Sequence, residues 1–260
     1  MSSFGGRNEG FNLKAAAGTS PGRTRAWKVS RDHGTFYCFS PPVMIATFVI
    51  ELSLALYTFW RYKLTAITRL AVVLFIALGT FQLAEYMVCR GIGGDALAWS
   101  RIGYMAITLL PPIGIHLLQV ISGDKRRWLI WPGYIAAVGF VAFFSLIGGA
   151  IDGHACLGNY VIFQVAPGFG GLFGLYYYGL LAATLLLGWR YAHRVRQKKA
   201  RRAIEGVMLG YTVFIIPATT VNLVNPATIS GIPSIMCGFA VLLALVLGFV
   251  VLPAAAQRRA

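Results

Sequence analysis

The chain is poor in charged residues, which make up 12% of its 260 positions. A soluble domain typically carries about 25% charged residues, because its surface must be polar. With 57% hydrophobic residues and a mean hydropathy of +0.68, this chain has too few polar side chains to cover a water-soluble globule. The composition therefore predicts an integral membrane protein.

Several motifs that define functional classes are also missing. The sequence has no Cys-x-x-Cys or His-x-x-x-His spacing, so we expect no metal site and no cofactor, although Asp152, His154 and Cys156 share one short segment. The stretch 232–253 holds no lysine, which excludes a retinal Schiff base there. Because no nucleophile–base spacing and no phosphate-binding loop occur, an enzyme is the weakest functional class.

Long apolar stretches are what the sequence has instead. A helix that crosses a bilayer needs roughly 20 apolar residues. Seven stretches meet this length: 41–60, 69–89, 101–122, 128–150, 168–190, 203–224 and 232–253. Trp60, Trp99, Trp128, Trp131 and Trp189 fall at their ends, as in the aromatic belts of membrane proteins. The expected fold is therefore all-α, a seven-transmembrane-helix bundle within residues 38–254.

The basic residues predict how this bundle is oriented. Lysine and arginine gather between the first and second, third and fourth, and fifth and sixth stretches, and again in the short tail 255–260. Since basic residues stay on the cytoplasmic side, we expect the N-terminus outside and the C-terminus in the cytoplasm. Residues 1–37 lack an apolar run and are rich in glycine and serine, so they are expected to form a flexible basic tail without a signal peptide.

The densest basic run lies in the fifth connection and predicts contact with membrane lipids. A basic residue beside anionic headgroups gains about 1 kcal/mol, which explains such a run without nucleic acid. No nucleic-acid partner is therefore expected. The residues concerned are Arg194, Arg196, Lys198, Lys199, Arg201 and Arg202.

Three of the four cysteines fall on or near the predicted outer side, where disulfides persist. Cys156 could pair with Cys38 or with Cys89, and the sequence does not choose between them.

Polar side chains inside the apolar stretches indicate a functional site, because an ionisable group in the bilayer costs roughly 3 kcal/mol and normally faces protein. Gln82 and Glu85 share one helix face, and Glu51 lies at a similar depth to Gln82. We expect Glu85 to pair with Arg101, and Glu51 to bond Gln82 or to be protonated, in an outward-facing polar pocket. The candidate pocket residues are Glu51, Gln82, Glu85, Tyr86, Arg101, Tyr104, His116 and Asn222. As an alternative, Gln82 and Glu85 could simply join packed helices, and His116 could be a satisfied core histidine.

Two resemblances add expectations about function. Cys38, Phe39 and Ser40, followed by Gln82 and Glu85, resemble an uncharacterised bacterial multi-pass membrane family that opens with Cys-Phe-Ser and carries Gln-x-x-Glu in its second helix. This chain departs from that pattern at Tyr86, where a glycine is usual, and in the residues that precede Cys38. The whole of 41–253, and 99–118 above all, is similar to the seven-helix sensor region that precedes some bacterial histidine kinases. The resemblances imply a protein of the bacterial inner membrane that senses a ligand or the membrane itself.

Three functions follow from these observations. The first is a sensor or ligand-binding module without an effector domain, which takes a small or lipid-like ligand and signals through a protein partner. The second is a structural or accessory subunit of a larger membrane complex. The third is a membrane enzyme or small transporter that uses Glu51, Glu85 and His116, with the enzyme as the weakest of these.

Overall fold

A computed structural model of the chain describes residues 41–91, 94–156, 161–166, 168–224 and 231–259. Its elements are mostly helical. They are α1 (Pro41–Arg61), α2 (Ala66–Arg90), α3 (Ala96–Ser122), the 3-10 turn η2 (Arg127–Leu129), α4 (Trp131–Leu146), β1 (Ile151–Cys156), β2 (Val161–Val165), α5 (Phe169–Arg194), α6 (Lys198–Val224), α7 (Ile232–Val246), the π-helical η4 (Leu247–Val251) and α8 (Leu252–Ala255). Cys38 and the tail 1–37 lie outside the described residues.

Six helices in the described part of the chain are long and apolar enough to cross a membrane, which indicates a multi-pass membrane protein. They are α1, α2, α3, α5, α6 and the continuous segment Ile232–Ala255 that joins α7, η4 and α8. The remaining predicted span, 128–150, contains α4, which has only 16 residues. At a rise of about 1.5 Å per residue such a helix is shorter than the roughly 30 Å hydrocarbon core. It ends early because Gly148 and Gly149 follow, and glycine is unfavourable in a helix.

Polar caps mark the start of α2 and α3, and glycines mark their ends. The Thr65 hydroxyl accepts the Thr68 N–H at the start of α2, and the Asp95 carboxylate accepts the Leu97 N–H at 3.0 Å at the start of α3. Gly91 and Gly123 end the same two helices with φ of 63° and 73°, a conformation that favours glycine.

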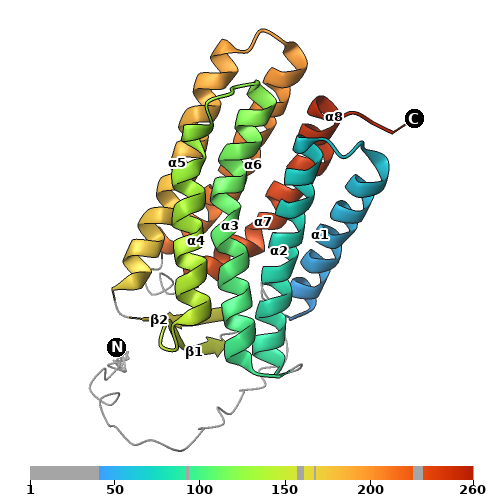
Figure 1. Ribbon diagram of the computed structural model, residues 1–260. Coiled ribbons are helices and arrows are strands. Elements are labelled where there is room, and N and C mark those ends of the chain that lie inside the picture. The colour runs from blue at the N-terminus through green and yellow to red at the C-terminus, as the bar shows by residue number, and fades with distance from the viewer. Residues whose placement is uncertain (1–40, 92–93, 157–160, 167, 225–230, 260) are drawn as a thin grey trace, which may run out of the picture. The chain divides into compact units, whose positions relative to one another are not determined.

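The helices run alternately up and down, so that the bundle has two chemically different ends (Figure 1). The first, here called the basic end, carries the turns α1–α2, α3–α4 and α5–α6 together with the C-terminal residues. There the Lys63 N–H donates to the Gln257 carbonyl (2.8 Å), and the Arg259 N–H donates to the Arg61 carbonyl (2.9 Å). The opposite end, here called the hairpin end, carries β1 and β2.

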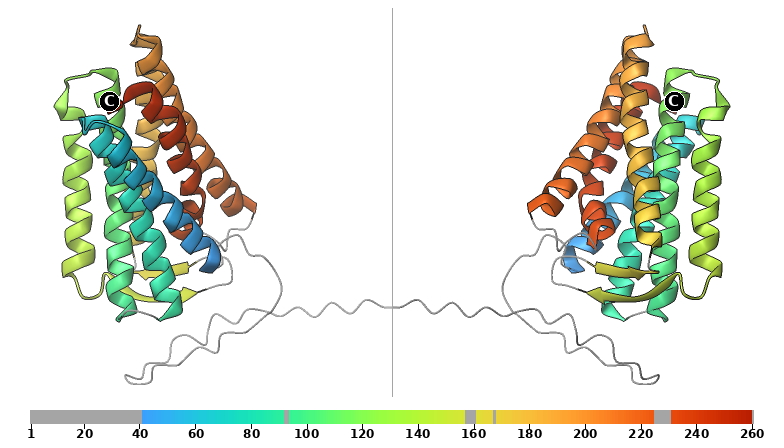
Figure 2. Two further views of the ribbon diagram at one scale, coloured as in Figure 1. Left: turned by 90° about the vertical axis from the view of Figure 1, so that its right-hand side faces the viewer. Right: turned by 90° about the vertical axis from the view of Figure 1, so that its left-hand side faces the viewer.

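The antiparallel hairpin β1–β2 lies across the helices at its end of the bundle, as both views of Figure 2 show. Sequence analysis did not predict these strands. Val161 and Phe163 are buried while Gln164 is exposed, so the strand presents one apolar face to the helices. The hairpin thereby closes the end of the helix core.

Close helix contacts form the centre of the bundle. Pro111 and Pro112 lie inside α3 without ending it, and both are buried. At Gly114 a Cβ atom would overlap the Tyr211 hydroxyl group, so the glycine allows α6 to approach α3 at this point.

Candidate ligand-binding site

Two buried carboxyl groups lie where α1, α2 and α7 meet. Glu51 and Glu85 are 0% and 1% exposed, and Glu51 lies against α2 at Gly79, two turns from Glu85. Glu85 therefore faces protein, as the sequence analysis expects. The two residues are called the carboxyl pair below.

Helix α7 supplies the polar partners of this region. Gln82 donates from Nε2 to the Cys237 carbonyl at 2.7 Å, which leaves the carboxyl pair without the predicted bond between Glu51 and Gln82. Ser234 hydrogen-bonds to the Glu85 carboxyl group and also accepts the Val161 N–H at 3.0 Å. Glu85 is thus linked through one hydroxyl group to the backbone of the hairpin.

Several oxygens of the carboxyl pair have no hydrogen-bond donor among the described residues. Both oxygens of Glu51 and Oε1 of Glu85 are buried without a hydrogen-bond partner among them. The ion pairs of the described chain are Asp124–Arg126 and Arg201–Glu205, so no lysine or arginine there neutralises either carboxyl group. Because an unsatisfied buried polar group is costly, such a pair is a candidate binding site.

A cavity of about 450 Å³ lies beside the carboxyl pair, between α3, β2, α5 and α7. Its volume falls within the range of small-molecule sites. Tyr104 and Cys237 line the cavity. The Cys237 carbonyl accepts from Gln82, one turn from Glu85 on α2, and α3 packs on α2 where Gly103 faces Ala84, next to Tyr104 and Glu85. The two side chains therefore form the wall of the cavity on the side of the carboxyl pair.

Aromatic rings provide most of the remaining surface. Phe163 and Phe173 each place their ring centroid 5.5 Å from that of Tyr104, and Tyr177 and Tyr178 extend the lining along α5. These rings pack on one another as well as on the cavity, so their positions are held by the fold.

Glycines on α5 create the space that the cavity occupies. Gly170, Gly171 and Gly174 line it, and a Cβ atom built on any of them meets nothing within 4 Å. Side chains at these positions would point into open space, so the absence of side chains keeps the cavity open. Glycines in membrane helices often allow close helix packing, but no other helix approaches closely at these three positions.

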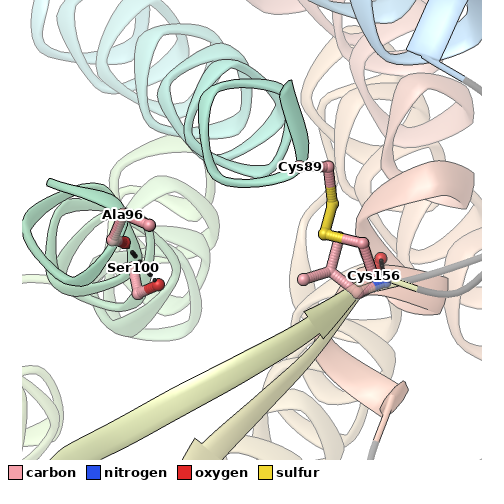
Figure 3. Close-up of a disulfide and its surroundings, with 6 residues drawn as sticks. Cys89, Ala96, Ser100 and Cys156 are labelled. Atoms are coloured by element: carbon pink, nitrogen blue, oxygen red, sulfur yellow. Dashed lines mark hydrogen bonds between the residues drawn. A yellow bond between two sulfur atoms is a disulfide. The ribbon is translucent and has the colours of Figure 1, made fainter. Parts of the chain in front are cut away.

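A disulfide ties the hairpin to the helices next to the cavity. Cys156 at the end of β1 is joined to Cys89 in the last turn of α2, with a Cα–Cα distance of 5.7 Å (Figure 3). This is one of the two pairings left open by the sequence. Because Phe163 and Val165 of β2 line the cavity, the disulfide and the Val161–Ser234 bond together hold one of its walls.

Two predicted pocket residues lie elsewhere, and the predicted ion pair is wrong. Arg101 donates from Nη2 to the Gly148 carbonyl at 3.4 Å, because it faces the end of α4 while Glu85 faces α7. His116 shares a hydrogen bond of 3.1 Å with the Tyr134 hydroxyl group. It follows Tyr104 by 12 residues along α3, or about 18 Å, which is too far to join the carboxyl pair.

Of the remaining candidates, Tyr86 does not line the cavity. Tyr86 is half-buried, and the Arg90 guanidinium lies over its ring at 6.0 Å. Asn222 belongs to the last turns of α6, but its side chain lies outside the described residues. The structure instead brings in Ser234 and Cys237, whose spacing of three residues on an apolar helix was the signal that could have identified them.

At the basic end, the predicted lipid-binding side chains are all exposed. They are Arg194, Arg196, Lys198, Lys199, Arg201 and Arg202. Arg194 and Arg196 line a surface hollow of about 530 Å³ together with Arg126. Arg126 itself binds Asp124 at 2.6 Å, and the hydrogen bonds from Arg126 hold the pKa of that carboxyl well below its usual range.

Comparison with known proteins supplies no relative: no protein-family model and no curated protein matches the chain. The two resemblances stay predictions, and the functional argument depends on the geometry of the site.

Proposed function

We propose that this protein is a membrane-embedded ligand-binding module of the sensor type, which takes a small apolar or lipid-like molecule into the cavity between α5 and α7. The observation that carries the proposal is an apolar cavity whose wall at Tyr104 and Cys237 adjoins the helix turns that hold two unsatisfied carboxyl groups. A site with an apolar lining and a few buried polar groups is the usual form of a small-molecule site.

The proposed orientation places the cavity toward the outside of a bacterial inner membrane. In this arrangement the 16-residue α4 is a seventh span, short enough to require local thinning of the bilayer. The N-terminus is outside and the C-terminus is cytoplasmic. The Cys89–Cys156 disulfide at the hairpin end supports it, because disulfides persist in oxidising compartments. The arginines and lysines of the basic end support it from the other side.

Helix α5 offers a route from the cavity to a partner protein. It starts with the glycines that line the cavity and ends at Arg194 in the basic end, so one rigid element connects the two. In the proposal, a ligand shifts α5 and thereby the exposed α5–α6 connection, which binds anionic lipid and an effector protein. A partner that responds to the ligand would distinguish this sensor from a purely structural subunit.

The first prediction concerns Gly174→Leu, which should displace the ligand. The leucine side chain would occupy the cavity without meeting other atoms at its Cβ, and leucine favours helix more than glycine does. Native mass spectrometry of the full chain extracted from its own membranes should detect a bound small molecule in the wild type and not in the variant.

Gly179→Leu is the matched control. Gly179 lies on the same helix, also meets nothing at its Cβ, and is exposed outside the cavity lining. This variant should retain the ligand. Equal retention by both variants, or a wild-type protein that carries no small molecule, would contradict the proposed function.

A further inference from the structure

We propose that the ligand of the cavity is an organic cation, with an apolar body against the aromatic rings and its positive charge at the end formed by Tyr104 and Cys237. This inference rests on the proposed function and specifies the chemistry of its ligand. It depends on three separate features of the site: the lack of a counter-ion, the aromatic lining and the position of the shared wall.

The carboxyl pair has no cation of its own within the described chain. Arg101, the basic residue expected to serve Glu85, is turned toward the Gly148 carbonyl. Three carboxyl oxygens remain without any partner there, two on Glu51 and one on Glu85. A cationic ligand supplies the counter-charge that favours ionised carboxyl groups in the protein interior, whereas an anionic ligand supplies none.

The lining of the cavity suits a positive charge. Aromatic faces attract organic cations through their quadrupole, and the attraction grows when the site is free of water. Tyr104, Phe163, Phe173 and Tyr177 are all at most 6% exposed, so their rings lie in a desolvated setting. Their hydrocarbon surface also accommodates the apolar body of the ligand.

The shared wall places the carboxyl pair beside one end of the cavity. The Cys237 carbonyl accepts from Gln82, Ser234 one turn earlier on α7 is the partner of Glu85, and Tyr104 lies where α3 packs on α2. In a low-dielectric interior the attraction between opposite charges extends further than it does in water. A ligand charge at this end is therefore stabilised without direct contact with either carboxyl group.

The test compares two probes of matched shape and opposite charge, tetraphenylphosphonium and tetraphenylborate. Each is titrated against the full chain in nanodiscs of zwitterionic lipid, with empty nanodiscs as the correction for partitioning. The wild type should bind tetraphenylphosphonium saturably and at least about tenfold more tightly than tetraphenylborate, which corresponds to a difference of about 1.4 kcal/mol.

Variants assign the preference to the carboxyl pair. Glu85→Gln and Glu51→Gln should each weaken tetraphenylphosphonium binding by about tenfold and leave tetraphenylborate binding unchanged or tighter. They lie on different helices, so one can report if the other fails to fold, and an intact Cys89–Cys156 disulfide identifies folded protein. Gly174→Leu should abolish saturable binding, and Gly179→Leu should not change it.

The outcomes separate this inference from the proposed function. Equal affinity for the two probes, or no effect of both Gln variants, overturns the cationic ligand while the effect of Gly174→Leu still supports the cavity as a binding site. If neither probe binds saturably, the inference also fails, and the ligand retained in native mass spectrometry then decides the proposed function on its own.

Discussion

Asp124 illustrates how single side chains hold the basic end together. It follows α3 in the turn before η2, binds Arg126 at 2.6 Å and accepts the Tyr191 hydroxyl at 2.9 Å. These bonds connect the α3–α4 turn to the last part of α5. Since hydrogen bonds from Arg126 lower the pKa of Asp124 in the folded state, the interaction stabilises the protein when the carboxyl group is ionised.

Asp124→Asn should therefore destabilise the protein at neutral pH. We expect a loss of roughly 1 kcal/mol for this part-exposed pair, or about 2–4 °C in apparent melting temperature. The contribution is complete above the unfolded-state pKa of about 4 and is lost as the pH falls toward the lower folded-state pKa. The melting difference between wild type and variant should accordingly shrink in acid.

Glu205→Gln provides the control for Asp124→Asn. Glu205 pairs with Arg201 at 2.8 Å, but both side chains are at least half exposed, so this change should have little effect at any pH. A melting difference for Asp124→Asn that stays constant from neutral pH into acid would contradict the role assigned to the ionised carboxyl group.

At the scale of elements, the hairpin depends on the covalent link between β1 and α2. The Cys89–Cys156 disulfide closes a loop of sequence separation 67, and such links typically contribute about 2–4 kcal/mol. Replacement of both cysteines by serine should lower the melting temperature and increase hydrogen exchange at the backbone amides of β2. The Val161 amide should be affected, because its partner Ser234 no longer faces a fixed strand.

Reduction of the disulfide in the wild type is the control for the double serine variant. Dithiothreitol should reproduce the destabilisation in the wild type and add nothing in the double serine variant. Alkylation of Cys89 and Cys156 in unreduced, folded protein would show that the link does not form.

Sequence reasoning located most elements, and its failures have physical reasons. The long apolar stretches predicted α1 to α3 and α5 to α7, because the bilayer imposes length and composition together. It overestimated α4, where Gly148 and Gly149 end the helix, and it missed the hairpin, whose strands are too short to give a clear alternating pattern.

For the site, the sequence predicts how deep a residue lies in the membrane but not which neighbouring helix its side chain faces. Sequence spacing places Glu51, Glu85 and Arg101 at a depth in the membrane, since helix rise is regular. It does not determine which neighbour each helix face meets, so Glu85 was assigned to Arg101 although it faces Ser234 on α7. The cavity is lined by glycines of α5, and no sequence motif predicts a cavity from glycines alone.

At the scale of the helical bundle, the two ends have different proposed functions: the hairpin end binds the ligand, and the basic end contacts lipid and a partner protein. The hairpin end holds the disulfide, the carboxyl pair and the cavity, while the basic end carries the exposed arginines and lysines. The central claim of the account is that the cavity is a ligand site open to the outer side of the membrane.

Labelling of Gly171→Cys tests this claim most directly. Gly171 lines the cavity and is exposed, and Gly179→Cys on the same helix serves as the control outside it. Both are made in a background with Cys38→Ser and Cys237→Ala, so that Cys89 and Cys156 remain paired. The reagent is a membrane-impermeant trimethylammonium methanethiosulfonate, applied to right-side-out and inside-out membrane vesicles.

The account predicts rapid modification of Gly171→Cys in right-side-out vesicles, protection by tetraphenylphosphonium, and little modification of Gly179→Cys. Modification of Gly171→Cys only in inside-out vesicles, or equal modification of both positions without protection, would contradict an outward-facing ligand cavity.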